Sequence, residues 1–144
     1  MRALATAILL AFTAAGAHAQ QSLPSFDFYG HHIGDTAIVG APWSRCTEEA
    51  KAGMAWCTRE RELLDNVSFQ AGYGYVGGRL ARIALSADAA NFDTVLRIFT
   101  KRFGQARAVT RGSGHAYAQW RFREGRLHLT RTGQVVVARF DPIG

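Results

Sequence analysis

The C-terminal part of the chain alternates between apolar and polar residues, in short runs separated by glycine-containing turns. This alternation is typical of antiparallel strands that bury one face and expose the other. Four strands are expected, over residues 106–110, 115–123, 126–131 and 134–140. The last three predict a C-terminal meander whose apolar face needs a covering layer, because an isolated hairpin is only marginally stable in water.

The pairing of these strands can be predicted from their turns. Loops of two residues at 124–125 and 132–133 place Phe122 opposite Leu127, and they place Leu129 opposite Val136. All apolar partners then share one face, whereas a slip of one residue would mix the two faces. The opposite face carries a candidate site for an anionic partner, with Arg121 and His128 in one row and Arg123, Arg126 and Arg139 stacked in the next. Forked guanidinium donors bind carboxylates and phosphates; the alternative is a solvated face whose arginine stems cover apolar surface.

An amphipathic helix is expected immediately before the meander, over residues 89–103. Its apolar residues recur at helical spacing along one side: Phe92, Val95, Leu96, Phe99 and Phe103. Gly104 is the expected residue after the helix end. Further strands are expected over residues 63–70, 73–76 and 79–85. We therefore predict an α+β fold, with one amphipathic helix packed on an antiparallel sheet that ends in a C-terminal meander.

The first nineteen residues have the architecture of a secretory signal peptide. Arg2 supplies a positive start, residues 3–15 are apolar, and Ala17-His18-Ala19 is a small-x-small cleavage site. The apolar run is too short to span a bilayer comfortably, although an uncleaved N-terminal anchor is the alternative. We expect cleavage after Ala19 and a single domain over residues 20–144. The protein would then lie in the periplasm or be secreted, without a stable membrane span.

Two cysteines follow the predicted leader, Cys46 and Cys57. An even number of cysteines in an exported chain indicates a disulfide. A metal site would need further ligands nearby, and a redox site usually has closer spacing. A short helix is expected inside the disulfide loop, over residues 48–56, with Thr47 as its N-cap.

Positive charge is concentrated toward the C-terminus. Residues 94–144 hold ten Lys and Arg against two Asp and Glu. Such a segment attracts anionic lipids, acidic glycans or nucleic acid, and export argues against nucleic acid. Alternatively, arginine serves only as the solubilising residue.

No catalytic or cofactor motif was found, and we predict no enzyme activity, cofactor or metal. His31 and His32 with Asp35 are a conceivable metal group. Adjacent histidines on a strand point to opposite faces, however, and so chelate poorly.

Three short motifs resemble small exported envelope proteins of the BamE/SmpA-like kind. They are Phe28-x-Gly30-x-x-Ile33-Gly34, the helix from Phe92-x-x-Val95 to Phe103-Gly104, and Trp120-x-Phe122. The resemblance implies helical elements on a small antiparallel sheet, and a binding or scaffolding role in outer-membrane assembly.

We therefore expect a non-catalytic binding or scaffolding module of the cell envelope. Its partner would be an envelope protein or an anionic envelope component. The first alternative is an exported inhibitor or immunity protein against an envelope hydrolase, with an anchor at Trp43, Trp56 or residues 111–114. The second is a small hydrolase.

Overall fold

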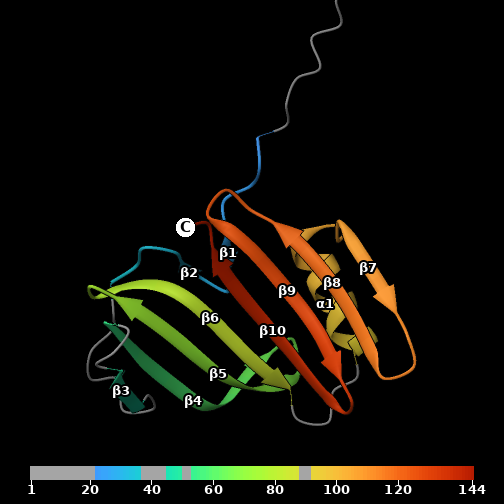
Figure 1. Cartoon of the computed structure of the whole chain (residues 1–144), viewed down its shortest axis with the longest axis horizontal. Helices are drawn as coiled ribbons and strands as arrows, with labels where there is room; N and C mark the ends of the chain where they lie inside the picture. The colour runs from blue at the N-terminus through green and yellow to red at the C-terminus, as the bar shows by residue number, and fades with distance from the viewer. Residues whose placement is uncertain (1–21, 37–44, 50–52, 88–91) are drawn as a thin grey trace, which may run out of the picture.

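The structure, a computed structural model, describes residues 22–36, 45–49, 53–87 and 92–144, and an antiparallel sheet dominates it (Figure 1). The elements are β1 (Asp27–Phe28), β2 (His31–His32), β3 (Arg45–Glu49), β4 (Met54–Leu64), β5 (Val67–Val76), β6 (Arg79–Ala87), α1 (Phe92–Phe103), β7 (Ala108–Arg111), β8 (His115–Arg121), β9 (Gly125–Thr132) and β10 (Val135–Pro142). Eight strands form one sheet in the order β3-β4-β5-β6-β10-β9-β8-β7, and β1 pairs with β2 separately. The last strand, β10, therefore joins the N-terminal hairpins to the C-terminal meander.

The predicted α+β class is wrong, because strands hold 61% of the described residues and α1 has only 12 residues. Two local errors contributed. The segment expected to be a helix inside the disulfide loop belongs to strands β3 and β4 where it is described. The segment expected to be one strand over 63–70 contains a turn, since Asp65 and Asn66 both adopt positive φ values of 47° and 68°. Asn and Asp tolerate this conformation better than other non-glycine residues, so a long β4–β5 hairpin forms.

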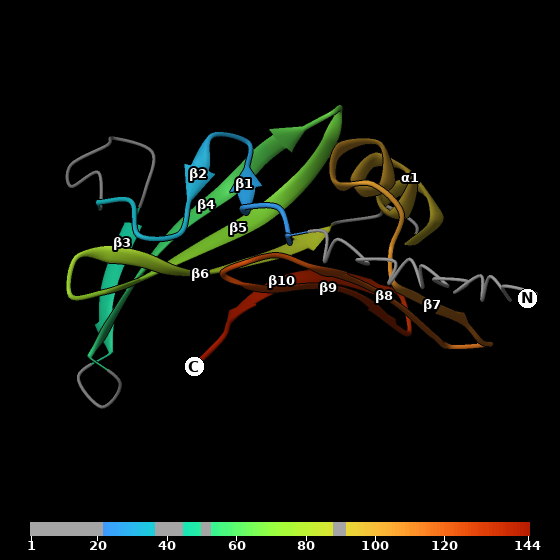
Figure 2. The ribbon, with the colours of Figure 1, turned by 90° about the horizontal axis from the view of Figure 1, so that it is seen from above.

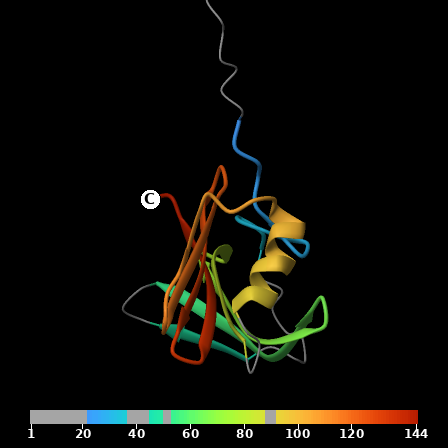
Figure 3. The same ribbon diagram turned by 90° about the vertical axis from the view of Figure 1, so that its right-hand side faces the viewer.

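One face of the sheet is covered by α1 and by the β1–β2 hairpin (Figure 2). Strands β4 and β5 run across the direction of β8–β10, so that the sheet is strongly twisted (Figure 3). Between the layers lies an aromatic core, in which the Phe26 ring lies 4.1 Å from that of Phe140 and 4.9 Å from that of Phe122. The Phe26 ring also lies 6.2 Å from that of Phe103 in α1, so the sheet, the helix and the segment that leads into β1 share one core.

The predicted helix stripe is confirmed for Phe92, Val95, Leu96 and Phe99, which are all buried. Its fifth member, Phe103, is partly buried. Helix α1 ends as expected at Gly104, whose φ is +84° and whose amide donates to the Thr100 carbonyl at 2.9 Å. This is the left-handed glycine cap, and the Trp120 indole donates to the Gly104 carbonyl at 2.8 Å.

The register predicted for the meander is wrong by two residues at both turns. Leu127 pairs with Trp120 and Phe140 instead of with Phe122 and Ala138. The first turn is longer than expected because the Glu124 side chain bonds to the N-terminal segment, where it accepts hydrogen bonds from the Ser25 hydroxyl and the Phe26 amide. A shift of two residues leaves each side chain within the paired strands on its predicted face.

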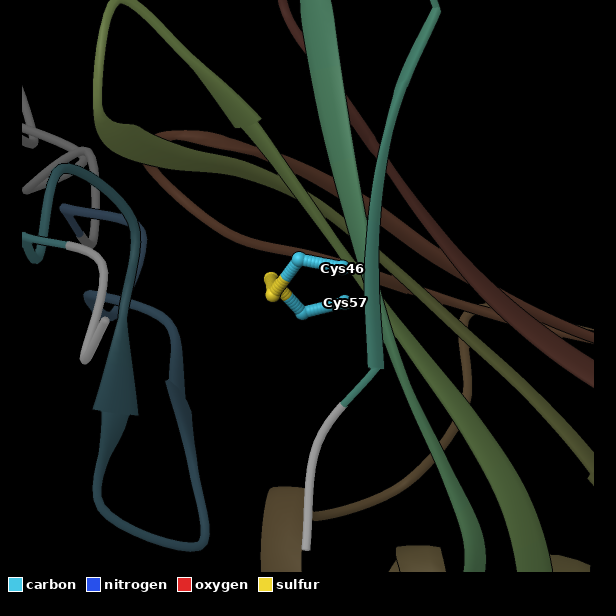
Figure 4. Close-up of a disulfide and its surroundings, with 2 residues drawn as sticks. All are labelled: Cys46 and Cys57. Carbon is cyan, nitrogen blue, oxygen red and sulfur yellow. A yellow bond between two sulfur atoms is a disulfide. The ribbon is translucent and has the colours of Figure 1, made fainter. Parts of the chain in front are cut away.

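The disulfide between Cys46 and Cys57 is confirmed (Figure 4). The two cysteines are direct partners across β3 and β4, with Cα atoms 4.0 Å apart. This separation suits a non-hydrogen-bonded antiparallel pair. The bridge therefore ties the edge strand β3 to the rest of the sheet.

Residues 1–19 and Trp43 lie outside the described residues, so the structure does not bear on the leader. Among the residues that it describes, no helix is long and apolar enough to cross a membrane.

Candidate functional site on the outer face of the sheet

The outer face is the side of the sheet turned away from α1 and the β1–β2 hairpin. Its side chains alternate along each strand with the buried ones. Across the strands they form rows set by the register. One row runs from β4 to β8 through Thr58, Gly72, Ala84, Arg139, His128 and Gln119. The next row runs through Gln70, Ser86, Val137, Thr130 and Tyr117.

Four of the five residues in the predicted anion site lie on this face. Arg121 stands directly opposite Arg126, and His128 stands opposite Arg139. Arg123 does not join them, because it lies in the turn between β8 and β9, where its amide donates to the Pro24 carbonyl. The expected row of three stacked arginines is thus replaced by one directly opposed pair, with Arg139 in the neighbouring row.

An aspartate that the sequence analysis missed lies within this basic group. Asp141 is the cross-strand partner of Arg126, and its Oδ2 lies 3.0 Å from the Arg139 Nε. The same oxygen lies 3.8 Å from the His128 Nε2. The predicted strand ends at residue 140, so this carboxylate has no predicted position. It holds the Arg139 guanidinium at a defined place on the face.

The Nδ1 side of His128 faces Tyr117. The Tyr117 hydroxyl donates to the Gln119 Oε1 at 2.8 Å and lies 2.9 Å from the His128 Nδ1. With that proton on Gln119, a hydrogen on Nδ1 of the imidazole would donate to the tyrosine oxygen. Burial lowers the pKa of His128, and Arg139 and Arg126 lower it further, while Asp141 acts in the opposite direction. The ring is therefore mainly neutral at pH 7.

A trough lies on the outer face beside the arginines, with a volume of about 500 Å³. Its floor is made of small residues at Gly72, Ala84 and Ser86. Trp56 lines it from β4, and the indole ring leans over the glycines of β5. A Cβ atom at Gly72 would lie 3.3 Å from the ring atoms Cε3 and Cζ3. A glycine inside a strand often marks such a close approach, and this was the one signal in the sequence that pointed to the trough.

The trough and the basic residues form one continuous surface. Ala84, on the floor, is the direct cross-strand partner of Arg139. A further arginine, Arg82, pairs with Gly74 on the same face. Four arginines therefore share this surface with Asp141.

Comparison of the chain with protein-family models, curated proteins and solved structures finds no match. The function must therefore be inferred from the outer face itself.

A second polar cluster lies on the inner side of β4 and β5. The buried Glu62 accepts hydrogen bonds from the Tyr73 hydroxyl at 2.9 Å and from the Arg59 Nη1 at 3.0 Å. Burial and the Glu62 carboxylate raise the pKa of Tyr73. Both carboxylate oxygens have partners, and a register shift lies in β4 between Arg59 and Glu62. This cluster stabilises the irregular part of β4.

The residues considered for metal binding, His31, His32 and Asp35, do not form a cluster of ligands. His31 lies against the Tyr73 ring, with 4.7 Å between centroids, and burial lowers its pKa. Asp35 accepts a hydrogen bond from the His32 amide. Within the described ranges, no three His, Cys, Asp or Glu residues gather as a metal site would require.

Proposed function

We propose that this protein is a non-catalytic binding module of the cell envelope. It is exported by its cleaved leader, and it binds an anionic envelope component through the outer face of the sheet. The observation that carries the proposal is the pair Arg121 and Arg126, which stand directly opposite each other on neighbouring strands. Like charges in this position destabilise a sheet.

The unfavourable charge arrangement is offset only in part by the protein itself. Asp141 contacts Arg139 and is the cross-strand neighbour of Arg126. Local conflicts of this kind are expected at functional sites. An anionic partner would supply the missing countercharge, and forked guanidinium groups would recognise its carboxylates or phosphates.

The arrangement also favours binding by holding part of the site in place. Asp141 bonds to the Arg139 guanidinium, and Tyr117 contacts the Nδ1 of His128. Groups that are ordered before binding lose less conformational entropy when a partner arrives.

The test compares two triple variants of equal net charge. Arg121→Ala/Arg126→Ala/Arg139→Ala removes charge from the outer face. Arg97→Ala/Arg107→Ala/Arg123→Ala removes the same charge from exposed positions elsewhere. Binding of the mature protein to phosphatidylglycerol vesicles and to trigalacturonate is measured at about 20 and about 150 mM salt.

We expect the outer-face variant to lose about tenfold or more in affinity for the anionic probe that binds. The matched variant should stay within about threefold of the parent, and the parent's affinity should fall as salt rises. Equal losses in both variants would mean that only net charge matters, and the proposal would be wrong. It would also be wrong if the parent bound neither probe at low salt.

A further inference from the structure

We infer that the trough beside Arg139 binds a sugar ring of an acidic glycan, with the carboxylate of the glycan on the arginines of the outer face. This inference rests on the proposed function and names the class of ligand. The trough volume of about 500 Å³ lies within the usual range for small-molecule sites.

The wall of the trough suits a sugar ring. Trp56 presents a large flat ring that packs over Gly72 and Gly74: a Cβ atom at Gly72 would press against the indole at 3.3 Å, and one at Gly74 would contact it at 3.4 Å. One side of a pyranose ring carries C–H groups that pack against an aromatic surface. The absence of side chains at these two glycines therefore gives Trp56 its place beside the open floor.

The polar residues of the trough suit sugar hydroxyls. Gln70 and Ser86 lie next to each other across β5 and β6, and both line the trough. Glu60 lines it from β4. Together these side chains offer amide, hydroxyl and carboxylate groups as donors and acceptors. A bare acyl chain would leave these groups without partners, at a cost in desolvation, so the lining favours a glycan over a lipid tail.

The negative and the positive charge beside the trough lie at opposite sides of it. Glu60 belongs to β4, whereas Arg139 belongs to β10, and three strand spacings of about 4.8 Å separate these strands. The direct pairing of Ala84 with Arg139 puts the backbone of Arg139 at the β10 side of the floor, and its guanidinium is bonded to Asp141 further along the same strand. A ring in the trough therefore lies with its hydroxyls toward Glu60 and its carboxylate within reach of Arg139. This polarity predicts selectivity for acidic over neutral sugars.

The experiment measures binding by calorimetry, with trigalacturonate and the neutral galactose trimer as probes. Trp56→Ala removes the aromatic wall, and Ala84→Leu fills the floor while Trp56 and every arginine stay unsubstituted. Trp56→Phe keeps an aromatic ring. Leu63→Ala is the control, because Leu63 is a large apolar residue of β4 that is 69% exposed and outside the trough. Circular dichroism and thermal unfolding check that each variant is folded.

We expect Trp56→Ala and Ala84→Leu each to weaken trigalacturonate binding by about tenfold or more. Trp56→Phe should stay within about threefold, and Leu63→Ala should bind like the parent. Arg139→Gln should reduce the preference for the acidic trimer over the neutral one. If Trp56→Ala fails to fold, the trigalacturonate binding of Ala84→Leu alone tests the inference.

Two results would overturn the inference. The first is unchanged trigalacturonate binding in both Trp56→Ala and Ala84→Leu. If the outer-face arginine variant still loses binding, the trough inference fails while the proposed function stands. The second is a parent protein that binds phosphatidylglycerol vesicles but not trigalacturonate, which would assign the face to a lipid surface.

Discussion

Gly125, at the start of β9, has no room for a side chain. A Cβ atom built there would overlap the Asp141 carbonyl oxygen and lie 2.7 Å from the Phe140 ring and 2.9 Å from the Pro142 Cα. Two of these three neighbours are backbone atoms, which cannot move aside without disturbing the pairing of β9 with β10. Position 125 therefore requires glycine, because no larger residue fits there.

We predict that Gly125→Ala lowers the free energy of unfolding by about 1–3 kcal/mol or more, as overpacking of a core does. Urea unfolding followed by circular dichroism measures it. Gly112→Ala is the control, since its Cβ would meet only the His115 carbonyl oxygen, at 3.3 Å, and it should cost less than about 1 kcal/mol. Similar losses in the two variants would show that the close approach at Gly125 does not limit stability.

Single residues also show why the trough could not be predicted from the sequence. Trp56 and Gly72 lie far enough apart in the chain that only the register of β4 against β5 brings them together. Ala84 reaches Arg139 through a second register, that of β6 against β10. Local periodicity predicts neither of these two pairings, because each pairing depends on which strands become neighbours in the sheet.

Among the elements, α1 connects the two halves of the sheet and seals the core. Phe99 is fully buried, and its ring lies 5.5 Å from that of Phe103 and 5.8 Å from that of Trp120. Trp120 is also bonded to the helix end at Gly104. The helix and β8 are therefore fastened together by packing and by a hydrogen bond.

Phe99→Ala should lower the free energy of unfolding by about 3–5 kcal/mol, because the lost transfer energy adds to the cost of a cavity. Chemical denaturation of the oxidised protein gives the value. Arg97→Ala on the exposed side of the same helix should change it by less than about 0.5 kcal/mol. A loss below about 1 kcal/mol for Phe99→Ala would contradict the position of this stripe in the core.

The elements differ in how far the sequence determines them. The helix was predictable because five apolar residues recur at its period and a glycine marks its end. The turn at Gly77-Gly78 was predictable too, and both glycines have positive φ values there. The β4–β5 hairpin was missed because its turn residues, Asp65 and Asn66, lie inside a run that otherwise resembles one strand. The faces of the meander were predicted correctly even though the pairing was not, since an even shift preserves them.

For the molecule as a whole, two partly buried histidines link stability to pH. Burial is the largest cause that lowers the pKa of both His31 and His128. Glu62 and Asp35 oppose the shift at His31, as Asp141 does at His128. In each case the unfolded chain takes up the proton more readily than the folded one. The contribution of the two neutral histidines to the free energy of unfolding is therefore complete above about pH 6.5. It decreases as the pH drops toward the lower pKa values that these histidines have in the folded state.

We predict that the free energy of unfolding decreases between about pH 7 and about pH 5. The double variant His31→Gln/His128→Gln should show a flatter dependence over this interval. Urea titrations at several pH values measure the slopes, and a double variant as steep as the parent would contradict the assignment.

The faces of the meander change only with odd slips of its pairing. A slip of two residues between neighbouring strands leaves Arg126, His128 and Arg139 on the outer face and their apolar neighbours in the core. A slip of one residue would turn a strand over and bring its arginines against the aromatic core. Hairpin loops of about two to five residues can join such strands, so the basic face can persist while the lengths of the turns near Glu124 and Gly133 change.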